Sequence, residues 1–128
     1  GQMSRAIMEG VAFALRDSME ICAKNGVFVK KTTICGGGAK SKLWRKIIAD
    51  VMGIPVEIPL TEQGPSYGAA ILAMVGAGEY GTVEEAVRNI VSVKETILPD
   101  MTKKAYYDKK YNKFKKLYPL LKDVFKEE

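Results

Sequence analysis

Histidine is absent from this sequence of 128 residues, which also contains only two cysteines and one tryptophan. The lack of histidine removes the commonest general base and the commonest metal ligand, so histidine-dependent triads and histidine-based zinc sites are excluded. Cys22 and Cys35 are too few for a disulfide framework. We expect both to be buried thiols in a protein of a reducing compartment.

Long apolar runs are missing as well. No run approaches the roughly 20 residues that a membrane-spanning helix needs, and no signal-peptide pattern is present. We therefore expect a cytoplasmic protein without a membrane partner. A chain of this length forms one domain at most. Its content of 47% hydrophobic and 27% charged residues is ordinary for a globular protein.

Excess positive charge is confined to the C-terminal segment. Residues 1–100 carry 11 Lys and Arg against 11 Asp and Glu, whereas residues 101–128 carry nine lysines against four acidic residues. This difference accounts for the whole net charge of +5. Because none of the excess is arginine, which dominates base readout and bidentate phosphate binding, we interpret it as a solvated helix face and expect no nucleic-acid partner.

Apolar periodicity and turn residues predict an α/β order with parallel strands. An apolar stripe marks the first helix, formed by Ile7, Val11, Ala14, Leu15, Ser18, Met19 and Cys22. The predicted elements are helix 3–25, strand 31–35, helix 41–53, strand 54–59, helix 67–75, helix 82–89 and a last helix from 102 that Pro119 breaks or kinks.

Burial is predicted for two of these elements and an edge position for a third. The β-branched run 31–35 is typical of a buried strand, and the nearly all-apolar run 67–75 is typical of a buried helix. Strand 54–59 contains Pro55 and Pro59, which favour a place at the edge of the sheet.

A glycine turn carries the one clear chemical signature. The run Ile34–Ser41 (ICGGGAKS) places three glycines between a strand and a helix. Consecutive glycines expose backbone N–H groups to an anion, and a helix N-terminus adds further N–H groups and a positive dipole end. Ala39 breaks the Walker pattern and Ser41 breaks the dinucleotide pattern. Taken alone, the turn is as consistent with a tight connection as with a ligand site.

The surrounding sequence resembles the FGGY family of carbohydrate kinases. The likeness is carried by the runs Gly36–Arg45 (GGGAKSKLWR), Ala49–Val56 (ADVMGIPV), Glu62–Ala73 (EQGPSYGAAILA) and Arg5–Phe13 (RAIMEGVAF). It extends through Tyr107–Leu121 and covers essentially the whole chain, and within the family it is greatest to the xylulose kinases.

This resemblance implies a partial actin-like ATPase lobe of ribonuclease H-like fold, with helices packed on a short parallel sheet. Residues 1–128 would be a single domain, the C-terminal nucleotide-binding lobe, with a core of 1–100 and a helical segment of 101–128. The implied nucleotide-binding residues are Gly36, Gly37, Gly38, Ala39 and Ser41, with Lys40 as a minor contact. Gly37 and Gly38 would lie nearest the phosphates, and Ser41 occupies a position beside adenine that is often Asn in relatives.

Three side chains near the turn have two interpretations each. Trp44 could stack on adenine, but its place in an apolar stripe favours a core residue. Asp50 could act in acid–base chemistry, but its spacing favours an i,i+4 ion pair with Lys46. Lys40 could touch phosphate, although a solvated lysine is the simpler interpretation. The tyrosines of the last helix are interpreted as packing residues.

The resemblance also implies what lies elsewhere. In this family the catalytic aspartate, the carboxylate that binds Mg²⁺ and most of the sugar site belong to other segments, so the chain is expected to contain no catalytic and no metal-binding residue. We expect a fragment, inactive alone, of an ATP- and Mg²⁺-dependent kinase that phosphorylates a pentulose, D-xylulose in the first instance. The strand near Ile34 would lack a neighbour, and an open apolar edge predicts self-association of the fragment.

Two alternatives remain at this point. The parent could phosphorylate gluconate or another sugar used by this family. The chain could instead be a non-enzymatic interaction module that uses its basic C-terminal helix to bind an acidic partner, with an affinity that falls steeply as salt is added.

Overall fold

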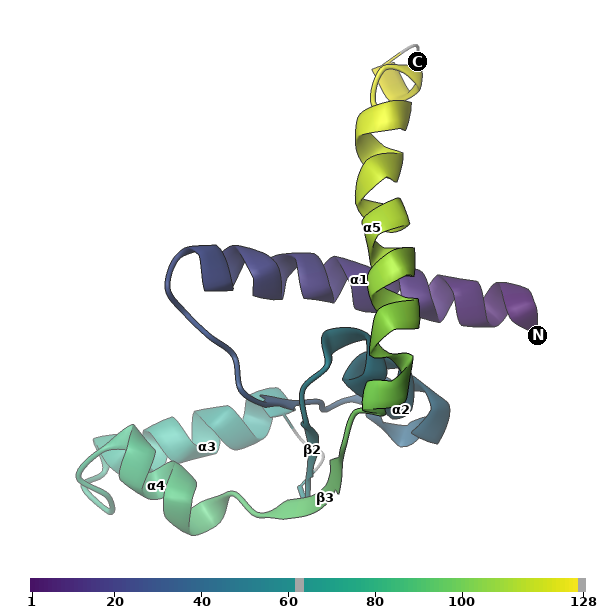
Figure 1. Cartoon of the computed structure of the whole chain (residues 1–128). Coiled ribbons are helices and arrows are strands. Elements are labelled where there is room, and N and C mark those ends of the chain that lie inside the picture. The colour runs from purple at the N-terminus through teal and green to yellow at the C-terminus, as the bar shows by residue number, and fades with distance from the viewer. Residues whose placement is uncertain (62–63, 127–128) are drawn as a thin grey trace.

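Three short strands form one sheet, with five α-helices around it, in the computed structural model, which describes residues 1–61 and 64–126 (Figure 1). The elements are α1 (Gln2–Lys24), β1 (Thr32–Thr33), α2 (Lys42–Met52), β2 (Val56–Pro59), α3 (Gly64–Gly76), α4 (Val83–Ile90), β3 (Val93–Ile97) and α5 (Lys104–Leu121), with short 3₁₀ helices at Gly37–Lys40, Met101–Lys103 and Val124–Lys126. Glu62 and Gln63, part of one block of resemblance, lie outside the described residues. Within the described ranges, no helix has the length and apolarity to cross a bilayer.

The sheet has the order β1-β2-β3 and is mixed. β1 and β2 are parallel, with Thr32 opposite Val56, which confirms the expected parallel pair. β2 and β3 are antiparallel, with Val56 opposite Ile97. β3 could not be identified from the sequence, because its side chains are mostly exposed and give no apolar signal.

β2 lies in the centre of this sheet, so the prediction of an edge position was wrong. Both prolines are tolerated there for local reasons. Pro55 precedes the strand and uses only its carbonyl, which accepts a bond of 3.1 Å from the Thr32 N–H. Pro59 is the last residue of β2, next to a register shift after Ile58 that releases it from regular pairing.

Helix boundaries follow the predicted signals closely except at α3, which begins at Gly64, three residues before the predicted start. α1 ends at Lys24, directly before Asn25 and Gly26, and α2 ends at Met52, directly before Gly53, whose φ of 70° is the left-handed conformation that favours glycine. Thr82 caps α4 by accepting a bond from the Glu85 N–H at 3.1 Å. α5 continues through Pro119 to Leu121, so a break at the proline is not observed.

The core lies where α1, α2 and α5 meet above the sheet (Figure 1). Tyr107 and Tyr111 of α5 are almost completely buried, and the ring of Phe13 on α1 lies 6.4 Å and 6.0 Å from theirs. The interpretation of these tyrosines as packing residues is therefore confirmed for both. Tyr118, farther along α5, is 66% exposed.

α1 packs with a different face from the one that its apolar stripe predicts. Ile7, Val11 and Leu15 are exposed, whereas Ala12 and Phe13 are buried. The opposite face packs on α5, where Phe13 contacts the rings of Tyr107 and Tyr111 and a set of polar contacts adjoins them. Arg16 pairs with Asp108 at 2.7 Å on this face, and its neighbour in the set is the buried Glu9.

Glu9 is 4% exposed and has three partners. Its carboxylate is 2.9 Å from Arg5 and 2.7 Å from Lys110, and the Tyr107 hydroxyl donates to it at 3.4 Å. Burial by itself raises the pKa of Glu9, but the hydrogen bonds from Lys110 and Arg5 outweigh it and lower the pKa below its usual value. The ionised form is therefore the one that the fold stabilises.

Replacing Glu9 by glutamine is expected to lower the free energy of unfolding at pH 7 by about 1–2 kcal/mol, because charge-assisted bonds are lost from a buried position. A carboxyl whose pKa is depressed on folding contributes stability that is present above its unfolded pKa and is lost as pH falls through the folded pKa. Urea unfolding of both proteins should therefore show a difference that shrinks below about pH 4. A difference independent of pH would contradict this role for Glu9.

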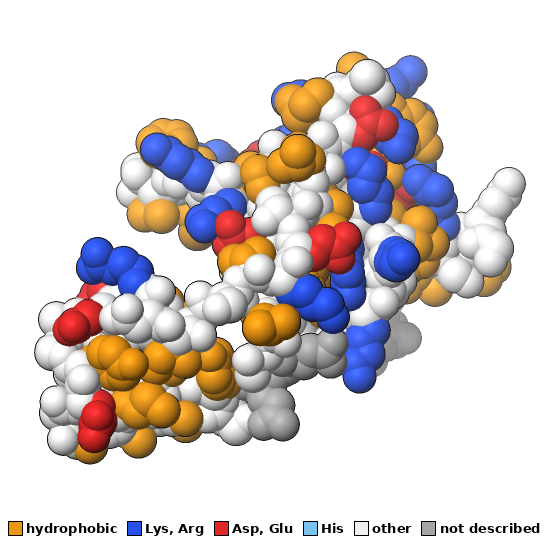
Figure 2. Space-filling model, turned by 90° about the horizontal axis from the view of Figure 1, so that it is seen from below, with side chains coloured by type: hydrophobic (Ala, Val, Ile, Leu, Met, Phe, Trp, Pro, Cys, Tyr) orange, Lys and Arg blue, Asp and Glu red, His pale blue; other side chains and the backbone are white. Residues whose placement is uncertain are grey.

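Several segments that we expected to be buried are exposed. Along α3 only Ile71 is buried, while Leu72 is 60% exposed. The side chains of residues 31–35 are half-buried or exposed, and Cys22 and Cys35 are both exposed. Apolar side chains gather on the α3–α4 part of the surface, at the lower left of Figure 2. These predictions of burial were wrong because the described residues place no second layer over these faces.

Candidate functional site

The glycine turn begins with a backbone conformation that requires glycine. Gly36 has a φ of 81°, which a residue with a side chain adopts only with strain. The chain then forms the 3₁₀ turn Gly37–Lys40, closed by bonds from the Ala39 N–H to the Gly36 carbonyl at 3.0 Å and from the Ser41 N–H to the Gly38 carbonyl at 3.1 Å. The structure thus brings all the proposed nucleotide-binding residues into one tight turn.

Ser41 joins this turn to α2. It is the N-cap residue of the helix, and its hydroxyl oxygen accepts a bond from the Trp44 N–H at 3.2 Å. Serine is favoured here because its oxygen satisfies one of the free N–H groups of the first helical turn. The hydroxyl hydrogen of Ser41 can still donate to a ligand.

Gly37 and Gly38 differ in the space around them. A Cβ atom on Gly37 would meet no described atom within 4 Å, and the backbone of Gly37 is not in the left-handed region. A Cβ on Gly38 would lie 3.1 Å from Nε1 and 3.2 Å from Cδ1 of Trp44. The turn therefore has an open side at Gly37 and rests on the indole at Gly38.

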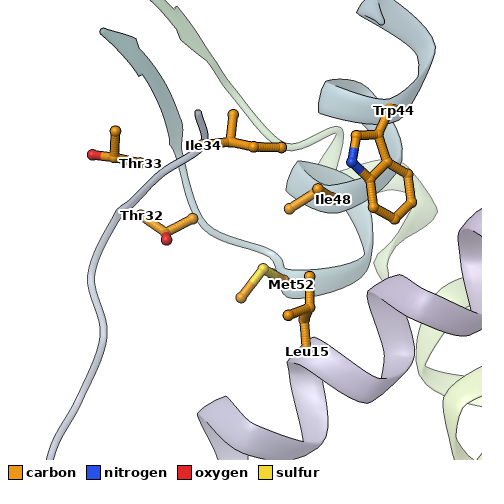
Figure 3. A pocket seen from close by; sticks show the side chains of 7 residues that line it. All are labelled: Leu15, Thr32, Thr33, Ile34, Trp44, Ile48 and Met52. Atoms are coloured by element: carbon orange, nitrogen blue, oxygen red, sulfur yellow. The ribbon is translucent and has the colours of Figure 1, made fainter. Parts of the chain in front are cut away.

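Trp44 is a core residue, as its apolar stripe predicts. It is partly buried and packs against the central cluster of α1, α2 and α5. Its indole also lines a hollow of about 320 Å³. Figure 3 shows Trp44, Ile48 and Met52 from α2 facing residues of the β1 segment across this hollow, with Leu15 of α1 below.

The hollow in Figure 3 lacks the groups that a phosphate needs. Among the residues that the structure describes, its lining is apolar except for Thr32 and Thr33 and includes no charged side chain. The residues of the glycine turn do not line it. The hollow is the gap between two helices and the outer strand β1, and it is separate from the candidate anion site at the turn.

A second helix begins beside the turn. A Cβ on Gly64, the first residue of α3, would lie 3.1 Å from Sγ of Cys35, so the start of α3 adjoins the residue that precedes the glycines. The N-terminal ends of α2 and α3 thus lie at the two ends of the Cys35–Ser41 segment. The positive dipole ends of both helices favour a negatively charged ligand there.

Asp50 has a structural role. It is 5% exposed and pairs with Lys46 at 2.8 Å, which confirms the predicted i,i+4 ion pair. Its carboxylate also accepts a bond of 2.7 Å from the Asp100 N–H and lies 3.7 Å from Lys103. These contacts tie α2 to the segment that leads into α5. Within residues 1–61 and 64–126, no three Asp, Glu or Cys side chains are grouped so that they could hold a metal ion.

Arg45 contacts the glycine turn, and this contact could not be predicted from the sequence. Its Nε donates to the Ala39 carbonyl, and its Nη1 lies 2.8 Å from a carboxylate oxygen of Glu95 on β3. The spacing of six residues to Ala39 fits no helical pair, and Glu95 lies 50 residues away, so neither contact leaves a signal in the sequence.

Known proteins resemble this chain in sequence. Residues 1–77 match the model of the C-terminal domain of the FGGY family of carbohydrate kinases. A xylulose kinase of Staphylococcus epidermidis is 34% identical over 121 residues, which are 94% of this chain and 24% of that protein. The L-xylulose/3-keto-L-gulonate kinase of Escherichia coli is 36% identical over 117 residues, 91% of this chain and 24% of that protein.

Solved structures show the same fold. The xylulose kinase of Rhodospirillum rubrum superposes with a TM-score of 0.84 and 33% identity, over 98% of this chain and 25% of that one. The gluconate kinase of Lactobacillus acidophilus superposes with a TM-score of 0.83 and 23% identity, over 93% of this chain and 24% of that one. The chain therefore spans about a quarter of the length of the proteins it matches.

Proposed function

The chain belongs to the FGGY family of carbohydrate kinases, and from this we propose that it is the nucleotide-binding part of an ATP-dependent sugar kinase. The observation that carries the proposal is the glycine turn Gly36–Ser41, which opens α2 and adjoins the start of α3. A turn with an unobstructed side and two helix N-termini suits the phosphates of a nucleotide.

Individual roles follow from the position of each residue in the turn. Gly36 sets the direction of the backbone, and Gly37 lets a phosphate approach closely because nothing within the described part of the chain fills the space beside it. Gly38 and Ala39 continue the turn, and Ser41 offers a hydroxyl on the adenine side. Lys40 follows the glycines and is proposed as a minor phosphate contact.

Mg²⁺ would accompany ATP, since it neutralises the charge that develops during phosphoryl transfer. We assign none of the described residues to it. The acid–base residue and the metal-binding carboxylate are proposed to lie in other segments of the complete kinase, so that this chain contributes one wall of the ATP site and is inactive alone. We propose a cytoplasmic enzyme.

D-Xylulose is the proposed acceptor, giving xylulose 5-phosphate. Its support is the recurrence of xylulose kinases among the relatives and among the solved structures with the same fold. Gluconate or another sugar of the family is the second candidate, because a kinase for 3-keto-L-gulonate is similar to the same extent. The residues that choose between these sugars are proposed to lie outside the chain.

An ATP-coupled assay of the complete kinase against a panel of sugars tests this proposal. We expect phosphoryl transfer to a ketopentose, with D-xylulose as the best acceptor by kcat/KM. Transfer to gluconate alone would change the proposed substrate but would still support the proposed kinase activity. An absence of ATP-dependent transfer to any sugar would overturn the proposed function.

A binding module based on the basic helix α5 is less well supported. Several of its lysines already serve the fold, since Lys110 pairs with Glu9, Lys104 with Asp108 and Lys115 with Glu20. Lys110 and Lys115 thereby hold α5 against α1, whereas the Lys104–Asp108 pair lies within α5. Salt-dependent capture of an acidic protein by the isolated chain would favour this alternative.

Self-association of the isolated chain remains a prediction. β1 is an outer strand of the sheet, and the apolar side chains Ile7, Val11 and Leu15 of α1 are exposed. An unpaired strand edge beside an apolar face favours pairing with a second copy. Sedimentation should show a dimer or larger species, and a compact monomer at high concentration would contradict this expectation.

A further inference from the structure

We propose that Arg45 is a positioning residue that holds the glycine turn in the shape required for nucleotide binding, and this inference rests on the proposed function. Its guanidinium joins three parts of the fold: it projects from the first turn of α2, donates to the Ala39 carbonyl in the glycine turn and pairs with Glu95 on β3. The side chain of Arg45 is 14% exposed.

The turn needs such a tether because its own backbone holds it weakly. Three consecutive glycines have the largest conformational entropy to lose on ordering. Within the turn, only the bonds from Ala39 N–H to Gly36 and from Ser41 N–H to Gly38 close the backbone among the described contacts. The Trp44 indole supports Gly38 from one side. Arg45 adds a charge-assisted bond at Ala39, which is itself 7% exposed.

Arginine is suited to this position by its geometry. Its planar guanidinium presents several N–H groups in fixed directions, so it can bind the carbonyl with Nε and the carboxylate with Nη1 at the same time. A lysine ammonium at the end of a flexible stem retains the charge but does not reproduce this fork. Of the two contacts of Arg45, the ion pair with Glu95 is the weaker one, because that carboxylate is 49% exposed.

The chain provides a matched control. Arg16 is also 14% exposed and also bridges a backbone carbonyl and a carboxylate, the Val51 carbonyl at 3.1 Å and Asp108 at 2.7 Å. Arg16, however, binds a carbonyl at the C-terminal end of α2, whereas Arg45 binds a carbonyl of the turn that precedes the helix. Arg45→Lys and Arg16→Lys therefore make the same chemical change at opposite ends of α2, and only the first should affect the turn.

The first measurement is hydrogen exchange on the chain without nucleotide. Arg45→Lys should speed exchange of the Ala39 and Ser41 amides by about fivefold or more, because both bonds that they donate close the turn. Arg16→Lys should change them by less than about twofold. Glu95→Gln, a milder change, should fall between the two. Unchanged exchange in Arg45→Lys, or an equal change in both arginine variants, would overturn the inference whether or not the protein is a kinase.

The second measurement is steady-state kinetics of the complete kinase. Arg45→Lys should raise the KM for ATP by about 3- to 10-fold while kcat and the KM for sugar stay within about twofold. Arg16→Lys should leave all three unchanged. An equal loss of kcat in both variants would indicate a general structural role and contradict the positioning role. A wild-type enzyme without kinase activity would instead refute the proposed function, and the exchange result would still decide the role of Arg45.

Discussion

Replacing Gly37 by valine should raise the KM for ATP of the complete kinase by about tenfold or more, while the KM for sugar changes little. The reason is that Gly37 is the open point of the turn. Its backbone conformation is accessible to any residue, and an added Cβ meets no described atom within 4 Å. The substitution should therefore cost the protein little stability and act on the ligand alone.

Gly10→Val is the matched control for this experiment. Gly10 also has nothing within 4 Å of a Cβ, but it lies in α1, away from the turn. Kinetics with ATP varied at saturating sugar should show a normal KM in this variant. An unchanged KM for ATP in Gly37→Val would remove Gly37 from the nucleotide site.

Replacing Tyr107 by alanine should lower the free energy of unfolding by about 3–5 kcal/mol, the range for deleting a fully buried aromatic ring. Tyr107 is 0% exposed, contacts the ring of Phe13 and donates to Glu9. Such a loss is a large part of the stability of a small domain, so the variant should be partly unfolded at room temperature.

Tyr118→Ala separates packing from surface binding on the same helix. Because Tyr118 is 66% exposed, its removal should change stability by less than about 0.5 kcal/mol. Thermal or urea unfolding monitored by circular dichroism measures both variants. Equal, small effects would mean that α5 does not pack as described, and they would favour its use as a binding surface.

Local signals in the sequence predicted the frame of the candidate site. The strand is marked by a β-branched run before the glycines. The helix is marked at its start by a serine three residues before Trp44 and at its end by a glycine at 53. Each of these signals acts through contacts within a few residues. Such features depend little on the rest of the fold. The site residues in the turn were predicted from the resemblance, and their contact with ATP remains a prediction.

Contacts between distant segments could not be predicted in the same way. Three such contacts depend on how distant segments pack in the folded protein. They are the pairing of β3 with β2, the bonds of Arg45 to Ala39 and Glu95, and the packing of Glu9 among α5 side chains. A polar residue such as Glu9 enters a core only when its partners are supplied by another element, and no periodicity marks that event.

Burial was predicted least well. The apolar stripe of α1 and the apolar helix α3 are real features of the sequence, yet Ile7 and Leu72 are exposed. A pattern tells which face is apolar and not what covers it. Since the proteins that it matches are about four times as long, we propose that other segments of the complete kinase cover these faces.

Titration of the ¹⁵N-labelled chain with Mg²⁺–ATP, followed by the chemical shifts of backbone amides, tests the central claim most directly. We predict weak, saturable shifts centred on Gly36, Gly37, Gly38 and Ser41 and on the start of α3, which adjoins them. The affinity for Mg²⁺–ATP should be low, because this chain supplies only one wall of the proposed ATP site. Shifts confined to the lysines of α5, or none at the glycines at saturating nucleotide, would contradict the claim that this turn binds ATP.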